Sequence, residues 1–352
     1  MNILFVMKHR GNAGNTHAVA DYMRVAPKFG HHVAIFGPTL PWLPEINFSD
    51  QVRGFDKAVY LFESEIYRLS PVRETMLIGG IARKDRMILD MDGMYNPVVC
   101  LDGYDRNHDT EEERAAWIEH YHALADRVHK PTLAPPATSR DVPLTFYGYD
   151  PALETDPKTA PEKIYDILHV GHNWWRGRDI ENILLPVVDK NRGKIGRICF
   201  IGLWWDKAPT EPGSGNPLAF AFDSEAFRRL DIETRDSVMY DKVVHAMSQA
   251  RINIFTQRPV LHHLRHLTLK YFEIFYADTI PLLVLDADHA ADVYGPAARE
   301  LILSAERAEE RIMDALARPE RYREIVQDVR RHLAKHHGYE LRMQELAAAL
   351  KN

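Results

Sequence analysis

Cysteine is almost absent from this sequence. Cys100 and Cys199 are the only two among 352 residues, which excludes a disulfide framework and a cysteine-rich metal site. Long apolar runs are missing too. The opening residues 1–6 are followed almost at once by the polar residues 8–10, and no later stretch reaches the roughly 20 residues that a membrane-spanning helix needs. We therefore expect a cytoplasmic protein that does not bind membranes.

An excess of positive charge is likewise missing, since the formal net charge is -6 at pH 7. A chain of this charge has no general electrostatic attraction to nucleic acid or to an anionic membrane, although a local basic cleft stays open as an alternative. Any phosphate that the protein binds should therefore belong to a small ligand.

The dinucleotide-binding fingerprint is absent where it would be expected. The apolar residues 2–7 predict a strand that leads through a glycine-containing loop into a helix, but the loop lacks the Gly-x-Gly-x-x-Gly spacing. No acidic residue ends the second strand, where Gly37 follows the last apolar residue. A nicotinamide cofactor is therefore not expected, and we expect Arg10, Gly11 and Asn12 to line a ligand cleft.

What the sequence does contain is a repeated alternation of strand and helix. Its 45% hydrophobic and 27% charged residues suit a globular protein, and its length suits two domains. The periodicity predicts strands at residues 2–7, 33–36, 57–62, 87–89, 98–101, 164–170, 197–202, 252–255 and 281–285. It predicts helices at residues 111–129, 179–189, 239–249, 268–276, 305–316, 319–336 and 340–350.

Proline marks the expected domain boundary, because seven prolines between residues 131 and 161 disfavour a long helix there. The alternation predicts an α/β protein with two Rossmann-like domains that face a central cleft. We expect an N-terminal domain at residues 1–150, a C-terminal domain at residues 151–335 and a closing helix at residues 336–352.

Ligands of open parallel sheets bind beyond the carboxyl ends of the strands, so the loop at residues 171–178 is a candidate site. It places two arginines, a glycine and a following helix together, which are elements that hold a diphosphate. The candidate residues are Gly171, His172, Asn173, Arg176 and Arg178. The alternative is a surface loop with solvated arginines.

A second candidate lies at the start of the helix expected at residues 268–276. A glutamate there can accept hydrogen bonds from both hydroxyls of a ribose, and a nearby lysine can neutralise phosphate. The candidate residues are Thr268, Lys270, Tyr271, Phe272 and Glu273. The alternative is that Glu273 is an ordinary first-turn glutamate favoured by the helix dipole.

Two tryptophan pairs adjoin the candidate loops, Trp174 with Trp175 and Trp204 with Trp205. Such rings stack on a sugar or a base, or they pack in a core or a hinge. The sequence leaves both interpretations open.

Residues 269–286 and the tail from residue 293 to 350 resemble the C-terminal block of the spore-maturation-type glycosyltransferases, which belong to the GT-B class and the group 1 family. Lys270, Phe272 and Glu273 match an Arg-x-Phe-Glu motif of that family. A closing His-x-Tyr-x-x-Arg motif is matched by His337, Tyr339 and Arg342. Residues 165–178 resemble the entry into its donor domain.

The resemblance implies sugar transfer from a nucleotide-diphosphate sugar bound by the C-terminal domain, with no metal or other cofactor required. It implies that Glu273 binds the ribose and that Lys270, Arg176 and Arg178 bind the diphosphate. It also implies that the C-terminal helix crosses back to the N-terminal domain. Lys270 replaces an arginine of the family, and Asp278 replaces a glycine that lets backbone amides approach phosphate. Both departures bear on the identity of the donor.

The N-terminal domain is expected to hold the acceptor and a general base. Asp92, near a predicted strand end, is the first candidate, with His9, Asp105 and Glu63 in reserve. Asp90 and Asp92 also form an Asp-x-Asp pair that could chelate a divalent ion, but we favour an ordinary turn and expect no metal site.

Three functions stay open at this point. The leading hypothesis is glycosyl transfer to an unidentified acceptor, which can be a small molecule, a glycan or a macromolecule. The alternatives are epimerisation of a nucleotide sugar on a similar fold and non-catalytic binding of a nucleotide sugar.

Overall fold

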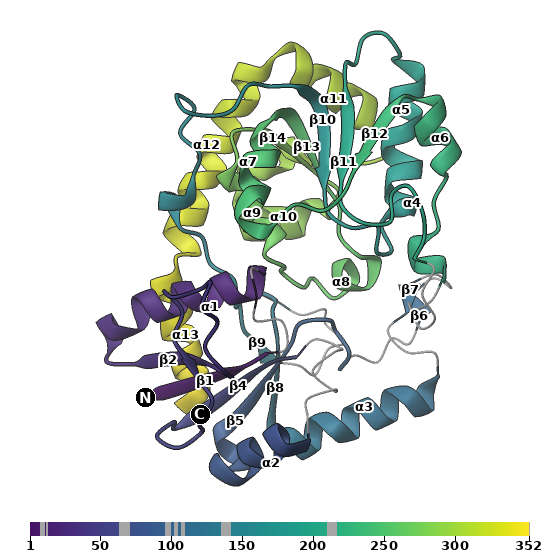
Figure 1. Cartoon of the computed structure of the whole chain (residues 1–352). Helices are drawn as coiled ribbons and strands as arrows, with labels where there is room; N and C mark the ends of the chain where they lie inside the picture. Colours follow the sequence, from purple (N-terminus) through teal and green to yellow (C-terminus); the bar gives the residue numbers. More distant parts are fainter. Residues whose placement is uncertain are drawn as a thin grey trace. The chain divides into compact units, whose positions relative to one another are not determined.

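The computed structural model describes residues 1–7, 11, 13–62, 71–95, 100–101, 105–106, 110–134, 142–209 and 217–351. The chain divides into two compact units. Unit 1 comprises Met1–Tyr149, His263–Leu269 and His336–Asn352, and unit 2 comprises Asp150–His262 and Lys270–Lys335. Each unit is built around a parallel sheet covered by helices (Figure 1), which confirms the predicted fold class.

The sheet of unit 1 has the strand order β3-β2-β1-β4-β5-β8-β9, and neighbouring strands run parallel. Its strands are β1 (Asn2–Val6), β2 (His32–Phe36), β3 (Phe48–Ser49), β4 (Lys57–Phe62), β5 (Arg86–Asp90), β8 (Arg127–Lys130) and β9 (Val142–Pro143). A separate antiparallel pair joins β6 (Cys100–Leu101) to β7 (Asp105–Arg106). The central strands are continuous apolar runs because helices cover both faces of such a sheet.

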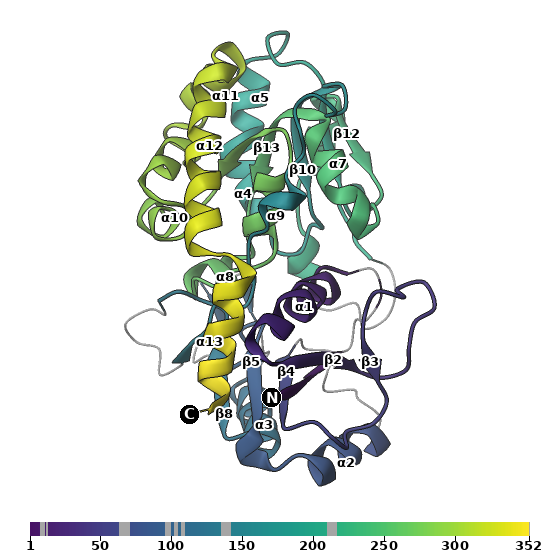
Figure 2. The same cartoon turned by 90° about the vertical axis from the view of Figure 1, so that its left-hand side faces the viewer.

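The helices of unit 1 include one from the far end of the chain. They are α1 (Gly14–Val25), α2 (Pro71–Gly80), α3 (Glu111–Leu124) and α13 (Tyr339–Lys351), with short 3-10 turns at Ala26–Phe29 and Arg83–Asp85. The ring of Tyr22 on α1 meets the ring of Tyr339 on α13 edge to face, with centroids 5.6 Å apart. Figure 2 shows α13 beside α1, so the prediction that the C-terminal helix returns to the N-terminal domain is confirmed.

The helix predicted over residues 111–129 is wrong in its last five residues. It begins as expected, since the Thr110 hydroxyl accepts a hydrogen bond from the Glu113 amide at 3.1 Å. It ends at Leu124, and Ala125 is extended with φ -148° and ψ 157°. The following residues form β8, which pairs with β5. Because β8 is polar and short, its strand character comes from this pairing rather than from its own sequence.

The sheet of unit 2 has the strand order β12-β11-β10-β13-β14, again with parallel neighbours. Its strands are β10 (Tyr165–Val170), β11 (Ile198–Ile201), β12 (Ile232–Arg235), β13 (Ala250–Phe255) and β14 (Ile280–Leu283). The edge strand β12 was not predicted. Parallel pairing brings the carboxyl ends of β10, β11 and β13 to one edge of the sheet, where ligands of such sheets bind.

The helices of unit 2 surround this sheet. They are α4 (Gly177–Asp179), a π-helical turn (Ile180–Leu184), α5 (Leu185–Lys190), α6 (Ser224–Arg229), α7 (Val243–Ser248), α8 (Pro259–His263), α9 (Lys270–Tyr276), α10 (Ala287–Tyr294), α11 (Ala308–Ala317) and α12 (Pro319–His336). Short 3-10 turns lie at Pro151–Leu153, Pro217–Phe220, Tyr240–Lys242 and Pro296–Leu301. Within the described ranges, no helix has both the length and the apolar character to cross a bilayer.

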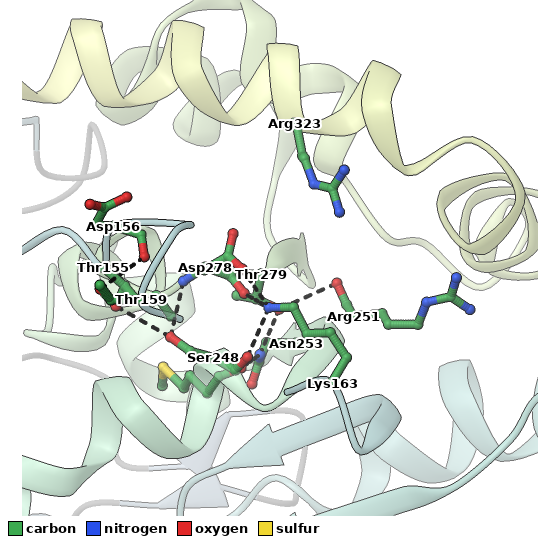
Figure 3. A network of polar contacts seen from close by, with 12 residues as sticks. Thr155, Asp156, Thr159, Lys163, Ser248, Arg251, Asn253, Asp278, Thr279 and Arg323 are labelled. Atoms are coloured by element: carbon green, nitrogen blue, oxygen red, sulfur yellow. Dashed lines mark hydrogen bonds and ion pairs between the residues drawn. The ribbon is translucent and has the colours of Figure 1, made fainter. Parts of the chain in front are cut away.

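A polar network ties together the segments that enter the unit 2 sheet (Figure 3). Lys163 precedes β10, and its ammonium donates to the Ser248 carbonyl oxygen at 2.8 Å and pairs with the Asp278 carboxylate at 2.8 Å. The Asp278 amide in turn donates to the Ser248 hydroxyl at 3.0 Å. Asp278 precedes β14, so it lies at the amino-terminal edge of the sheet. The interpretation that its substitution for glycine affects a phosphate site is therefore wrong.

We expect Lys163→Met to lower the free energy of unfolding by about 1–3 kcal/mol, because the Ser248 and Asp278 groups lose their charged donor. Urea denaturation measures the change. Lys158→Met, which alters an exposed lysine of the same connecting segment, is the matched control. Equal stability of the two variants would contradict a role for the network.

Candidate functional site

The loop after β10 is held in shape by the loop after β11. Gly202 has φ 153°, and a Cβ atom at this position would lie 2.2 Å from the Gly171 carbonyl oxygen, so only glycine allows the two loops to touch. The Trp205 indole donates to the same carbonyl oxygen at 2.7 Å. The Asn173 amide donates to the Leu203 carbonyl oxygen at 2.9 Å. The loop predicted to bind phosphate therefore has a fixed backbone.

Arg176 extends from this loop toward the end of β13. Its Nε donates to the Thr256 carbonyl oxygen at 3.3 Å, and its Nη1 donates to the His172 carbonyl oxygen at 2.8 Å. The Thr256 hydroxyl donates to the Asp179 carboxylate at 2.6 Å, while burial raises the pKa of Asp179. The half-buried guanidinium of Arg176 thus lies between the loops that follow two adjacent strands.

A small cavity of about 20 Å³ brings several predicted residues together. Gly171, Arg176, Thr256 and Lys270 all line it, so two cationic side chains from separate segments meet at the carboxyl edge of the sheet. This volume is close to that of one water molecule, so a diphosphate requires side chains to move.

Lys270 and Glu273 form an ion pair at the start of α9. The Lys270 ammonium lies 3.0 Å from a Glu273 carboxylate oxygen, and the side chains are 30% and 4% exposed. A carboxylate this deeply buried needs a charged or hydrogen-bonding partner, because desolvation without one costs several kcal/mol. Lys270 is that partner.

Other predicted donor residues have packing roles in the structure. Tyr271 and Phe272 are fully buried on α9. The Tyr271 hydroxyl donates to the Gln257 side chain at 2.7 Å, and burial raises the pKa of Tyr271. Asn173 is fully buried and its amide nitrogen donates to the Trp204 and Phe220 carbonyl oxygens. Tyr271 and Phe272 therefore pack inside unit 2, and Asn173 holds the loop after β10 in place.

Three other candidate residues, His172, Arg178 and Thr268, do not line the small cavity. The Nδ1 of His172 accepts a hydrogen bond from the Leu203 amide at 2.9 Å, and burial with the Arg176 charge lowers the pKa of His172 to about 4. Arg178 is exposed on α4. Thr268 belongs to unit 1 and precedes α9 rather than opening it, as the prediction had it.

His169 lies on β10 just before the phosphate loop and also lines the small cavity. Its Nδ1 donates to the Ile254 carbonyl oxygen at 3.0 Å, which fixes the tautomer of a neutral ring. Burial lowers the pKa of His169 to about 3. The ring is therefore uncharged at neutral pH.

In unit 1 the corresponding sheet edge carries a buried carboxylate at the end of β5. Asp90 accepts hydrogen bonds from the amides of Met94 and Tyr95, both at 2.9 Å, and from the Tyr121 hydroxyl at 2.6 Å. Burial raises the pKa of Asp90 to about 6, against the opposing effects of Lys130 and these hydrogen bonds. The bonds shape the turn that carries half-buried Asp92, in which Gly93 has φ 70°.

Sequence reasoning missed two buried residues near the turn that follows β5. Lys130 ends β8 and is 1% exposed, and His266 is fully buried. Burial and the Lys130 charge lower the pKa of His266 to about 3. Lys130 is the last residue of β8, and a lysine at the end of a strand is a candidate site residue. Because β8 was not predicted from the sequence, Lys130 could not be identified.

The structure says little about the reserve candidates for the general base and about the loop before α1. Asp105 is fully buried in β7. His9, Arg10, Asn12 and Glu63 lie outside the described residues, while Gly11 accepts a hydrogen bond from the Ala13 amide at 2.8 Å just before α1. Among the residues that the structure describes, no group of three His, Cys, Asp or Glu side chains is arranged to hold a metal ion.

Comparison with known proteins finds one matching family model and several similar folds. Residues 178–348, just under half of the chain, match the family described as glycosyl transferase-like. No curated protein matches the chain. The matched part of the chain contains Lys270 and Glu273.

Several solved structures have the same fold. T4 phage β-glucosyltransferase in complex with UDP-glucose is 12% identical, with a TM-score of 0.60 and coverage of 100% of this chain and 99% of that chain. An α-glucosyltransferase in complex with UDP and a 13-mer DNA is 11% identical, with a TM-score of 0.59 and coverage of 100% of both chains. The T4 phage enzyme with UDP and Mn2+ is 13% identical, with a TM-score of 0.55, over 100% and 99% of the two chains.

The class that these findings define is that of a glycosyltransferase of GT-B fold, which confirms the leading hypothesis from the sequence. The narrower resemblance to spore-maturation-type enzymes stays a hypothesis.

His169 gives a prediction for pH dependence. Between its ordinary pKa of 6.5 and the folded-state value of about 3, the unfolded chain binds a proton that the folded chain does not. The free energy of unfolding therefore decreases as the pH falls below about 6.5. In His169→Asn, which keeps a donor for the Ile254 carbonyl oxygen, the free energy of unfolding should depend less on pH. Between about pH 6 and pH 4.5 its slope should be smaller than that of the wild type by about 1.4 kcal/mol per pH unit.

Urea denaturation at several pH values measures the two slopes. His263→Asn, at an exposed histidine, is the control. Parallel slopes for the wild type and His169→Asn would show that His169 takes up a proton in the folded protein.

Proposed function

We propose that the protein transfers a sugar from a uridine-diphosphate sugar bound by unit 2 to an acceptor whose reacting hydroxyl is activated by a residue of unit 1. The observation that carries the proposal is the meeting of Arg176 and Lys270 at one cavity, with the buried Glu273 carboxylate on Lys270. Lys270 and Glu273 lie within the segment that matches the glycosyl transferase-like family. The nucleotide is proposed from the similar structures, which contain UDP or UDP-glucose.

Donor binding rearranges the Lys270–Glu273 pair. The diphosphate attracts the Lys270 ammonium, which as a compact point charge on a flexible stem adapts to either partner. Two ribose hydroxyls then donate to the Glu273 carboxylate in its place. The exchange keeps the buried carboxylate satisfied before and after binding, which a buried charge requires.

Arg176 and Lys270 also stabilise the leaving diphosphate during sugar transfer. Negative charge develops on the diphosphate as its bond to the anomeric carbon breaks, and fixed cations beside it stabilise that charge. Arg176 is held by the Thr256 and His172 carbonyl oxygens, so its guanidinium is oriented before the reaction. We therefore propose transfer without a metal ion, although one similar structure contains Mn2+ with UDP.

Asp92 is the proposed general base. It is half-buried in the turn after β5, so unlike the fully buried Asp90 it is partly accessible to solvent. Asp90 holds that turn through the amides of Met94 and Tyr95. Asp90 is therefore a positioning residue in this proposal.

A panel of nucleotides tests the donor assignment. We expect UDP and UDP-sugars to raise the melting temperature more than ADP or GDP, both with EDTA and with Mn2+. A ligand at a hundredfold excess over its dissociation constant adds about 2.7 kcal/mol to the free energy of unfolding. Failure of every nucleotide to stabilise the protein would refute the proposed function.

Glu273→Ala should weaken binding of the stabilising nucleotide at least about tenfold, because two charge-assisted hydrogen bonds are lost. Glu273→Gln should lose part of the affinity. Isothermal titration calorimetry measures both, with Glu320→Ala as the control at an exposed glutamate of α12. Unchanged affinity together with a lower melting temperature would make Glu273 a structural residue.

Asp92→Asn should slow sugar transfer by about 10²–10⁴-fold, the usual contribution of a general base, while leaving nucleotide affinity unchanged. Release of UDP from the donor measures the rate, with water as acceptor until a better one is found. Asp126→Asn, at a half-exposed aspartate of unit 1, is the control. Wild-type rates in Asp92→Asn would place the base elsewhere.

A further inference from the structure

The two tryptophan pairs of unit 2 divide between core and surface. Trp175 and Trp205 are each 1% exposed, whereas their neighbours Trp174 and Trp204 are half-buried. The half-buried rings and Phe220 form a closed triangle with centroid distances of 5.9, 5.0 and 4.8 Å. We call Trp174, Trp204 and Phe220 the aromatic platform.

Trp204 of the platform, and Trp175 next to Trp174, have unfavourable backbone conformations. Trp175 and Trp204 have φ 62° and 70°, a left-handed region that bulky side chains rarely adopt. Such a conformation persists where the surroundings impose it, and it gathers at ligand sites. Here the Trp175 amide donates to the Ala219 carbonyl oxygen at 2.7 Å, and Asn173 donates to the Trp204 and Phe220 carbonyl oxygens.

Part of the apolar surface around the platform is exposed. Leu203 and Leu218, beside it in sequence, are exposed, and the chain continues from Trp205 into exposed Asp206 and Lys207. An apolar ring surface next to charged and polar groups suits a ligand with C–H bonds on one face and hydroxyls around its edge. A sugar ring has that chemistry.

The sheet order separates Trp204 of the platform from the part of the proposed nucleotide site on α9. Lys270 and Glu273 follow β13, which lies on one side of β10, whereas Trp204 follows β11, which lies on the other side. The phosphate loop after β10 is between them. Glu273 and Trp204 therefore lie on opposite sides of β10, and we assign the rings to a part of the substrates other than the ribose.

We propose that the aromatic platform binds a pyranose ring of the acceptor, so that the acceptor is a saccharide or a glycoside. The proposal rests on the proposed function for the presence of sugar substrates. The half-exposed faces of Trp174 and Trp204 stack on the C–H face of the ring. His172, whose ring lies 5.5 Å from that of Trp204, adjoins the platform on the side of the phosphate loop.

Saturation-transfer NMR on the full chain tests the proposal with methyl glucoside, methyl galactoside and cellobiose as probes. The wild-type protein is expected to transfer saturation to at least one probe, which shows that the probe binds. Trp204→Ala and Trp174→Ala should each weaken that binding by about fivefold or more, and Trp204→Phe should restore part of it. Trp42→Ala, at a tryptophan of unit 1 that is 66% exposed, should have no effect.

Titration with UDP and UDP-glucose on the same variants separates the possible roles. Unchanged affinity for both nucleotides, with reduced saccharide binding, supports an acceptor site. Reduced UDP affinity in Trp204→Ala would assign the rings to the nucleobase, and reduced affinity for UDP-glucose alone would assign them to the donor sugar; either result overturns the proposal.

Two further outcomes also overturn it: no probe bound by the wild type, or equal binding by Trp204→Ala. If the wild type binds a saccharide through these rings but no nucleotide, the donor assignment fails while the platform stands. The two proposals therefore fail by different measurements.

Discussion

Parallel pairing of β10 with β11 and β13 is the constraint on which the candidate donor site depends. Because the three strands run the same way, the loops that follow them converge at one edge of the unit 2 sheet. Gly171, Arg176 and Lys270, which are far apart in the chain, line one cavity for this reason. The contact of Gly202 with the Gly171 carbonyl oxygen then fixes the loops against each other.

Buried charge is the second feature that both units share. In unit 2 the Glu273 carboxylate is almost fully buried against Lys270, and in unit 1 the buried Asp90 carboxylate has three hydrogen-bond donors near Lys130. Buried groups of this kind cost stability unless they are well satisfied, and they gather at functional sites. Their roles differ, since the Lys270 pair can exchange partners with a ligand whereas the Asp90 bonds hold a turn.

Much of the fold was predictable because local pattern and tertiary environment agree. The strand at Lys57–Phe62 and the helix at Pro319–His336 fall where the periodicity placed them. The errors lie where local pattern and pairing disagree. Polar β8 was included in a helix, and the half-polar edge strand β12 was missed, since each is a strand only through its neighbour.

The candidate site divides in the same way. The glycine, arginines, lysine and glutamate that suit a nucleotide were visible from residue type and their place after strands. Which side chains of a short helix face inward was not, and Tyr271 and Phe272 prove to be fully buried. Lys130 and His266 could not be predicted from the sequence, because their burial near the turn after β5 depends on segments remote in the chain.

The sequence by itself determined the alternation of strands and helices, and hence two parallel α/β sheets, because the spacing of apolar residues is a local property of the chain. Only the tertiary structure decided that Asp278 lies at the amino-terminal edge of its sheet and that Trp174 and Trp204, rather than Trp175 and Trp205, reach the surface. Adjacent residues of one type have the same local pattern. Their burial differs because packing partners such as Ala219, Leu203 and Gly171 come from other segments and impose the backbone conformation at each position.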